Sequence, residues 1–396
     1  MIIKRILSEK VKDLAKVFPV IAIMGPRQSG KTTLARKSFS NYKYISLEEH
    51  RNREIAVSDP GAFIEAHKDV PGLILDEIQE APALLSYIQT HVDLNKKPGF
   101  FIISGSHNFL LNEKISQTLA GRVVICTLLP LSITEIMAYL KMQNLDSLSL
   151  DDVLFKGCYP FIYSGGANPV DLYPSYIKTY VERDVRQITN ITDLTTFQRF
   201  MGLCAGRIGQ ILNITSLAND CGISVLTAKS WLSILAASYI IFLLQPHHKN
   251  FSKRLIKSPK LYFYDTGLAC SILGIEATDQ LINHYLRGNL FESFVVSELC
   301  KQRYNIGREP RVYFWRDQTG HEVDCIIEKA QELIPVEIKV NSAISQDMFS
   351  GINYWNKLAK TKHPEGSSFL VYGGKDNYKI KAGHAISWRS IEKVSQ

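Results

Sequence analysis

The sequence predicts an α/β protein of 396 residues in three parts, which we place at residues 1–145, 150–285 and 286–396. Three observations support this fold class. Short apolar runs alternate with helical patterns in the first part, apolar residues recur every three or four positions in the second, and strand patterns return in the third. The chain is also longer than one compact domain usually is.

In the first part, the apolar runs are expected to form the strands of one buried sheet. Continuous apolar runs separated by helical stretches, such as Pro82–Asp93, are typical of parallel strands covered by helices on both faces. The expected strands are Val20–Met24, Lys43–Leu47, Leu73–Leu75, Phe100–Ser104 and Val123–Leu129.

The second part is expected to be mainly helical, with two helices across Thr215–Leu235 joined by a tight turn at residues 221–223. Ser224 is placed to cap the second helix. Strands at Tyr239–Leu244 and Leu261–Tyr264 flank a basic loop, so the layout is that of a winged helix. The basic residues of this loop are His247, His248, Lys249, Lys253, Arg254 and Lys257.

The third part is expected to be a compact α/β unit in which a helix precedes three strands. A second helix and a further strand follow. The helices are expected at Leu290–Arg303 and Ser345–Leu358, and the strands at Arg311–Arg316, Glu322–Glu328, Leu333–Val340 and Ser368–Tyr372.

The charge is distributed unevenly along the chain. Lys and Arg number 46 against 38 Asp and Glu, and the stretch 178–260 alone carries 11 basic and 4 acidic residues. This stretch favours a polyanionic partner, although a merely solvated basic face has the same composition. The seven scattered cysteines, the charged start and the absence of a membrane-length apolar run lead us to expect a cytoplasmic protein without a membrane segment.

A phosphate-binding loop is predicted where the first strand meets a helix. The glycines let the backbone wind closely around phosphate, so that successive amides point inward. Lys31 is expected to reach the β- and γ-phosphates of ATP, and the Thr32 hydroxyl to bind Mg²⁺. The loop residues are Gly25, Pro26, Arg27, Gln28, Ser29, Gly30, Lys31, Thr32 and Thr33.

Other candidate residues of this site follow later strands. Asp76 is expected to hold the magnesium shell, directly or through water, and Glu77 to orient or deprotonate the attacking water. The pair could instead be an acidic cap of the next helix. Ser104 is a candidate sensor of the γ-phosphate, with a plain turn as the alternative. Arg122 is expected either to contact phosphate, in its own chain or a neighbouring subunit, or to form a salt bridge.

These motifs resemble those of prokaryotic AAA-type ATPases related to archaeal ATPases and STAND-type signalling ATPases. The matching stretches are GPRQSGKTTL, LILDEIQ, ISGS and LAGR followed by LPLSITE. The likeness continues through YVERDV, YFYDTGLA and NLFESFVVSEL into the C-terminal domain of unknown function that accompanies this group. The resemblance covers nearly the whole chain and implies ATP hydrolysis by an AAA-like domain.

The third part carries a second candidate site. Glu292 on a helix, Asp324 on one strand, and Glu337 with Lys339 on the next resemble the PD-(D/E)xK pattern of restriction-endonuclease-like domains. In such a site the three carboxylates bind Mg²⁺ or Mn²⁺, and the lysine helps to position or activate the nucleophile. The alternative is a solvated hairpin with an ordinary Glu–Lys pair. Glu298 and Asp317 are spare carboxylates that could replace Glu292.

Two functions remain open at this level. The first is an ATP-driven protein that binds nucleic acid, DNA rather than RNA, and cuts or grips it. For this function the second helix of the winged helix offers Thr227, Lys229 and Ser230 to the major groove, although the same module could be a lid on the ATPase domain or on another subunit. The second is a nucleotide-dependent switch that acts on protein partners, with a homo-oligomer as a possible form.

Overall fold

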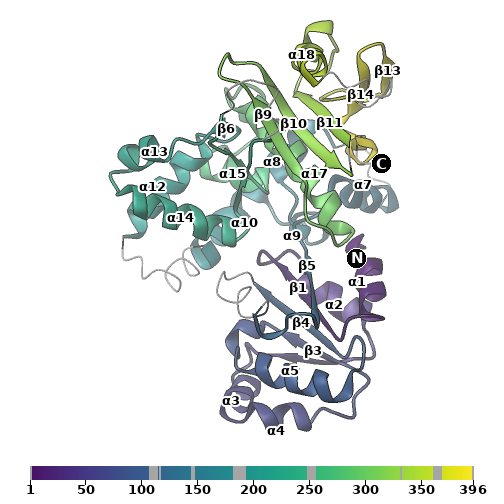
Figure 1. The fold of residues 1–396 in the computed structure, drawn as a ribbon. Coiled ribbons are helices and arrows are strands. Elements are labelled where there is room, and N and C mark those ends of the chain that lie inside the picture. The colour runs from purple at the N-terminus through teal and green to yellow at the C-terminus, as the bar shows by residue number, and fades with distance from the viewer. Residues whose placement is uncertain are drawn as a thin grey trace. The chain divides into compact units, whose positions relative to one another are not determined.

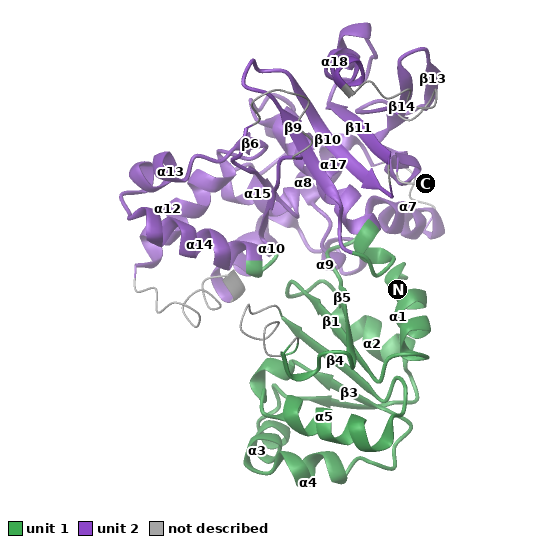
Figure 2. Ribbon diagram, in the orientation of Figure 1, with its two compact units in different colours: residues 1–131, 237–239, 303–308 green, residues 132–236, 240–302, 309–396 purple. Residues whose placement is uncertain are grey.

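The computed structural model describes residues 2–106, 115, 117–143, 148–181, 193–247, 256–330, 332–359 and 368–394. The chain divides into two compact units, which Figure 2 colours separately. Unit 1 comprises residues 1–131, 237–239 and 303–308. Unit 2 comprises residues 132–236, 240–302 and 309–396.

The expected boundary between residues 285 and 286 lies inside unit 2. The helix that follows this boundary is bonded to the strand that precedes it. The Ser293 hydroxyl accepts from the Phe263 amide at 3.0 Å, and the Ser297 hydroxyl donates to the Tyr264 carbonyl at 2.8 Å. The middle and C-terminal regions therefore share one compact unit.

Unit 1 is built on a five-stranded sheet of order β2-β3-β4-β1-β5, and every pairing in it is parallel. This confirms the expected parallel sheet, with strand ends within two residues of the predicted ones. The strands are β1 (Val20–Gly25), β2 (Lys43–Ser46), β3 (Leu73–Asp76), β4 (Phe101–Ser106) and β5 (Val123–Thr127).

Helices cover both faces of this sheet (Figure 1). Alternate residues of β1 face opposite sides, so that Ala22 packs with α3–α5 and Ile23 packs with α1 and α2. The helices are α1 (Leu7–Ala15), α2 (Lys31–Ser38), α3 (His50–Ser58), α4 (Pro60–Glu65) and α5 (Leu84–Asn95), with a 3-10 turn η1 (Ile78–Glu80) after β3.

The first part of unit 2 is mainly helical, as the spacing predicted. Local caps define several helix starts: the Ser132 side chain and Glu135 form a capping box, and Asp265 accepts from the Leu268 amide at 2.9 Å. The helices are α7 (Ile133–Met142), α8 (Leu150–Lys156), α9 (Pro160–Ser164), α10 (Pro169–Tyr176), η2 (Ile177–Val181), α12 (Leu194–Ala205), α13 (Ile214–Cys221), α14 (Val225–Ala237), α15 (Thr266–Ile272) and α16 (Thr278–Ile282).

Helices α13 and α14 are joined by the expected tight turn. Gly222 ends α13 with φ 76°, a conformation that glycine adopts without strain, and the Ser224 hydroxyl accepts from the Thr227 amide at 3.0 Å. An antiparallel sheet of order β6-β8-β7 follows. Its strands are β6 (Gln210–Ile211), β7 (Ile241–Leu244) and β8 (Lys260–Phe263). Of the predicted basic loop, residues 248–255 lie outside the described part of the chain.

The C-terminal part of unit 2 is a six-stranded sheet of order β13-β14-β12-β11-β10-β9. In this sheet β10 pairs antiparallel with both β9 and β11, and β12 then pairs parallel with β11. The elements are α17 (Arg287–Asn305), β9 (Val312–Arg316), β10 (Glu322–Lys329), β11 (Glu332–Lys339), η3 (Gln346–Phe349), α18 (Ser350–Ala359), β12 (Phe369–Tyr372), β13 (Tyr378–Ile380), β14 (Gly383–Ser387) and η4 (Trp388–Val394).

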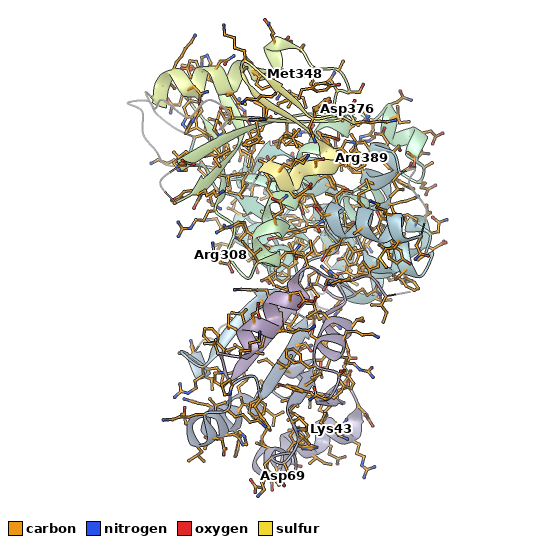
Figure 3. All side chains as sticks on the ribbon, turned by 90° about the vertical axis from the view of Figure 1, so that its right-hand side faces the viewer. Lys43, Asp69, Arg308, Met348, Asp376 and Arg389 are labelled. Atoms are coloured by element: carbon orange, nitrogen blue, oxygen red, sulfur yellow. The ribbon has the colours of Figure 1, made fainter. Side chains whose placement is uncertain are left out.

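The last turns of the chain are bonded to the start of unit 2. Arg389 of η4, labelled in Figure 3, donates from Nη2 to the Leu148 carbonyl at 2.6 Å. Across the described residues, no helix is both long and apolar enough to cross a membrane.

Candidate functional site

The phosphate-binding loop leaves β1 at Gly25 and enters α2 at Lys31. A Cβ on Gly25 would lie 2.2 Å from the Leu128 carbonyl oxygen, so only glycine fits there. Gly30 has φ 95° and immediately precedes the helix, whose first amides face the loop. The Lys31 ammonium donates to the carbonyls of Gly25 and Pro26 at 3.0 and 2.9 Å, which keeps it over the loop.

Arg5 supports this loop from the N-terminal segment, a role that the sequence patterns did not indicate. Its guanidinium is buried and donates to the Ser29 carbonyl at 2.6 Å and to the Leu129 carbonyl at 2.7 Å. Arg5 therefore links the loop to the segment after β5. No motif marks this position, because an isolated arginine close to Met1 has no characteristic spacing.

Asp76 at the end of β3 accepts hydrogen bonds from three hydroxyl groups. Thr32 and Tyr44 donate to Oδ2 at 2.8 and 2.9 Å, and Ser104 donates to Oδ1. Ser104 is fully buried and bonded to Asp76, so it supports the carboxylate. Burial, followed by the charge of Asp76, raises the pKa of Tyr44 to about 12, so its phenol remains a donor.

Glu77 has a left-handed backbone, φ 57°, which turns its side chain toward the end of β4. Its Oε2 accepts from the Ser106 amide at 3.1 Å, the Ser106 hydroxyl at 3.2 Å and the Gln79 amide group. Burial raises the pKa of Glu77, but the charge of Lys31 and these donors outweigh it and hold the pKa below its ordinary value. Glu77 is therefore an ionised acceptor beside Lys31. Ser106 and Gln79 were not singled out by sequence reasoning, although both lie in the quoted motifs.

The residues around this loop fit a magnesium nucleotide. Among the described residues, the buried Ser29 hydroxyl and the Gln79 carbonyl oxygen have no hydrogen-bond partner, and both lie beside the loop or Glu77. The Thr32 hydroxyl and the Asp76 carboxylate are oxygen donors of the kind Mg²⁺ prefers. The loop amides and Lys31 together form an anion site.

Arg122 does not lie at the loop of its own chain. It precedes β5, and the parallel register of Val20 with Val123 places it at the opposite edge of the sheet from Gly25. Its guanidinium forms a two-point salt bridge with Asp93, at 2.6 and 2.9 Å. Of the roles left open for Arg122, the structure shows the salt bridge and, within the residues that it describes, no contact with the loop of the same chain.

A second cleft of about 520 Å³ lies in unit 2. It gathers all four residues of the C-terminal prediction, and the middle region adds Lys260 from β8. The lining residues are Gly209, Gln210, Ile211, Lys260, Glu292, Arg316, Gly320, His321, Glu322, Asp324, Glu337, Lys339, Ser350 and Gly351.

Asp324 and Glu337 lie side by side on β10 and β11 with Lys339 between them. The Lys339 ammonium donates to Asp324 Oδ2 at 3.0 Å and to Glu337 Oε2 at 2.8 Å, and the Ile338 amide donates to Asp324 Oδ2 at 2.9 Å. Burial, followed by the charge of Asp324, raises the pKa of Glu337 to about 9. Burial also raises the pKa of Asp324, but Lys339 and Lys260 outweigh it and lower that pKa. Glu337 therefore keeps its proton to a higher pH than Asp324 does.

Glu292 is held in a different way from these two carboxylates. It accepts from the Lys260 ammonium at 2.9 Å and from the Tyr262 hydroxyl at 2.5 Å, while Lys260 also pairs with Glu322. Burial raises the pKa of Glu292 more than Lys260 lowers it. Among the described residues, no three Asp, Glu, His or Cys side chains are grouped so that they could hold a metal ion. Glu292 is therefore paired with Lys260, and the three-carboxylate metal site stays a prediction.

Neither spare carboxylate lines this cleft. Glu298 is buried, pairs with Lys301 at 2.8 Å and accepts from the Ile133 amide at the start of α7. Asp317 is also buried and accepts from the amides of Thr319 and His321, at 2.9 and 3.0 Å, in the turn between β9 and β10. Both carboxylates stabilise the fold around the cleft.

Gly351 lets α18 approach the cleft. A Cβ at this position would lie 2.0 Å from Glu337 Oε1 and 2.3 Å from the Glu322 carbonyl oxygen. The sequence contains no signal for this requirement, because the contact joins a helix to two strands. On α14, Lys229 and Ser230 are exposed, whereas Thr227 is half-buried and bonded to the Ser224 hydroxyl at 2.8 Å.

Comparisons with known proteins divide the chain into three matched regions. The family described as AAA domain matches residues 17–137, and two families described as domains of unknown function, DUF8612 and DUF4143, match residues 147–279 and 287–391. Uncharacterized proteins of Mycobacterium tuberculosis and Mycobacterium bovis are each 30% identical to this chain over 340 residues, which is 84% of this chain and 74% of theirs.

Three solved structures show weaker likeness. A Walker-type ATPase of Pyrococcus abyssi has TM-score 0.45 and 14% identity, covering 67% of this chain and 94% of that one. AMPPCP-bound DnaA from Aquifex aeolicus has TM-score 0.33 and 16% identity, covering 58% of this chain and 86% of that one. The RuvB Holliday junction branch migration motor of Thermotoga maritima has TM-score 0.30 and 17% identity, covering 62% of this chain and 91% of that one. These scores are too low to say anything of the activity of this chain.

Proposed function

The chain belongs to the same family as its two mycobacterial relatives and carries an AAA domain at residues 17–137, and on this premise we propose that it is a Mg²⁺-dependent ATPase whose nucleotide state controls the binding of nucleic acid. The observation that carries the ATPase part is the arrangement around β3. Asp76 is bonded to the Thr32 hydroxyl, and the ionised Glu77 follows it directly.

Each residue of this site has a role that its geometry supports. The loop amides and Lys31 bind the phosphates, and Thr32 and Asp76 hold Mg²⁺, which neutralises phosphate charge when it is bound. Glu77 accepts a proton from the attacking water. Ser106 and Gln79 orient Glu77 through its Oε2 atom.

Phosphate release from ATP tests this assignment. Lys31→Ala is expected to abolish nucleotide binding, and Glu77→Gln to bind ATP while losing turnover by at least about 100-fold. Glu80→Gln is the matched control, because Glu80 is a nearby carboxylate that pairs with Arg53 at 3.2 Å. Normal turnover in Glu77→Gln would remove Glu77 from the mechanism.

The nucleic-acid part rests on α13, α14 and the antiparallel sheet that follows, which we propose to be a winged helix. Lys229 is exposed on α14, in the helix that such modules place in the major groove, and the surrounding stretch is rich in Lys and Arg. Contacts of this kind would anchor the protein on phosphates and bind DNA with little sequence preference.

DNA binding is tested by fluorescence anisotropy over a series of salt concentrations, starting near about 50 mM. Lys229→Ala is expected to lower the log–log salt slope by about one, as for the loss of one phosphate contact. Lys68→Ala is the control, since Lys68 is an exposed lysine of unit 1. If the wild-type protein has no affinity for DNA or RNA at low salt, this part of the proposal fails.

A second candidate for the cleft of unit 2 is metal-dependent cleavage of nucleic acid by a nuclease-like domain. The adjacent Asp324, Glu337 and Lys339 favour it. The test is cleavage of DNA and RNA with Mg²⁺ or Mn²⁺, with and without ATP. Asp324→Ala is expected to remove cleavage, and Glu328→Ala on the same strand to preserve it. Equal cleavage by both variants would exclude this cleft as the active site.

Another function with the same ATPase is a nucleotide-dependent switch that acts on protein partners as a homo-oligomer. The half-buried Arg122 is the feature that favours it, because its guanidinium, now paired with Asp93 away from its own loop, could serve the loop of a second copy. Light scattering with ADP and with a non-hydrolysable ATP analogue tests this. A molecular mass that is independent of nucleotide would argue against the switch.

A further inference from the structure

Lys260 is a buried cation in the cleft of unit 2, and it belongs to no part of the carboxylate–lysine pattern in the sequence. Its ammonium bonds Glu292 at 2.9 Å and pairs with Glu322. The charge lies 5.6 Å from the centre of the Phe314 ring, and its side chain is 5% exposed. Carboxylates from α17 and β10 thus converge on a lysine from β8.

The backbone holds Lys260 in this position. Lys260 is paired with Ile211 of β6 on one side and with Leu244 of β7 on the other, so its strand is the centre of the three-stranded sheet. The Tyr262 hydroxyl, two residues along the same face of β8, donates to the same Glu292 oxygen. The backbone of Lys260 is therefore fixed at the centre of this sheet, and its ammonium can leave the carboxylates only by giving up the contacts with Glu292 and Glu322.

Lys339 differs from Lys260 in its exposure. It bridges Asp324 and Glu337 at 3.0 and 2.8 Å, but its side chain is 36% exposed. An exposed lysine can turn toward solvent at low cost, because water replaces its hydrogen bonds. Removing the partner of a buried lysine leaves an unpaired charge, which is strongly unfavourable.

We propose that Lys260 is a tethered cation that takes the place of a divalent ion between Glu292 and Glu322. The cleft therefore holds at most one divalent ion, on Asp324 and Glu337, from which Lys339 can withdraw. This inference rests on the cleft of the proposed function and specifies it, because it excludes a two-ion site. Glu292 is accordingly a positioning residue for Lys260.

Counting bound Mn²⁺ by electron paramagnetic resonance tests the proposal on the full chain without nucleotide. All variants carry Asp76→Asn, which removes the ion ligand of the ATP site. Lys260→Met keeps the length of the side chain and removes its charge. It is expected to bind one Mn²⁺ ion more than the background protein, which carries Asp76→Asn alone. The added ion should bind on the order of 100-fold more tightly to Lys260→Met than to the background protein. Lys260→Met with Glu292→Gln is expected to lose that ion again.

Two results would overturn the proposal. One is that the Asp76→Asn background protein already binds two ions and loses one of them when Glu292→Gln is added. The other is an unchanged ion count in Lys260→Met. Because the count needs neither ATP turnover nor nucleic acid, a failure of DNA binding would remove the proposed function without affecting this test.

Folding of the variant is measured separately, since Lys260→Met removes the ammonium from between two carboxylates and leaves Glu292 with the Tyr262 hydroxyl and Glu322 with Arg316. Added Mn²⁺ is expected to raise the melting temperature of Lys260→Met, because an ion that binds only the folded state stabilises it. The rise should be absent in the background and in the variant that also carries Glu292→Gln and Glu322→Gln. An equal rise in all three proteins contradicts the tethered-cation role.

Discussion

Replacing Tyr44 by Phe isolates one contact of the ATPase site. The variant removes the hydroxyl that donates to Asp76 Oδ2 at 2.9 Å. It keeps the aromatic ring, over which the Arg36 guanidinium lies at 4.7 Å. Asp76 retains its bonds from Thr32 and Ser104. Any change in activity therefore reports the loss of a single donor.

The expected magnitude follows from the charge and exposure of this hydrogen bond. A hydrogen bond to a charged group contributes about 1.5–3 kcal/mol, and the half-buried position of Tyr44 places this one at the low end. A loss of about 1.5 kcal/mol corresponds to about a tenfold fall in kcat/KM for MgATP. Because the oriented carboxylate holds Mg²⁺, the variant should also need more Mg²⁺ for half-maximal rate.

Phosphate release measured against Mg²⁺ and ATP checks this result. Tyr42→Phe is the matched control, because the Tyr42 hydroxyl makes no hydrogen bond to the site residues described here. The pKa of Tyr44 is about 12, so the defect should be constant between about pH 6 and 9. A kcat/KM within twofold of wild type and an unchanged Mg²⁺ requirement would refute the role of this hydroxyl.

Three further predictions concern unit 2. Gly351→Ala is expected to displace the Glu337 carboxylate, 2.0 Å from the added Cβ, and to cost about 1–3 kcal/mol in urea unfolding; an unchanged midpoint contradicts the close approach. Glu298→Ala removes the carboxylate that pairs with the buried Lys301 and should cost about 3–5 kcal/mol, whereas Glu298→Leu with Lys301→Met should be nearly neutral; equal losses would contradict this reasoning. Because the pKa of Glu337 is raised to about 9, the folded state keeps a proton that the unfolded state loses. Stability in EDTA should therefore fall as pH rises from the ordinary glutamate range to about 9, and Glu337→Gln should flatten this fall; parallel pH curves for the two proteins would show that this proton is absent.

The first unit could be predicted in most of its detail. Its five strands are continuous apolar runs, and the glycines of the loop are required by the backbone itself, as the contact of Gly25 with the Leu128 carbonyl illustrates. Short elements such as β6 and β13 were missed, because two or three residues carry no periodicity. The sequence did not decide whether Arg122 contacts phosphate or forms a salt bridge, since a lone arginine does not reveal at which end of the strands it lies.

The candidate cleft was predictable only in part. Asp324, Glu337 and Lys339 are close in sequence, so the pairing of two adjacent strands brings them together. Lys260, Tyr262 and Gly351 lie on elements far from these strands along the chain, and no local spacing relates them.

The sequence alone determined that this protein has a phosphate-binding loop with an acidic strand end, because those residues act through the backbone of one strand, one turn and one helix. It also determined the alternation that makes the sheet of unit 1 parallel. Only the tertiary structure decided that Tyr44 and Ser104 hold Asp76, that Arg122 pairs with Asp93, and that a buried lysine occupies the carboxylate cleft. The physical reason is that packing brings together side chains whose separation along the chain carries no periodic signal.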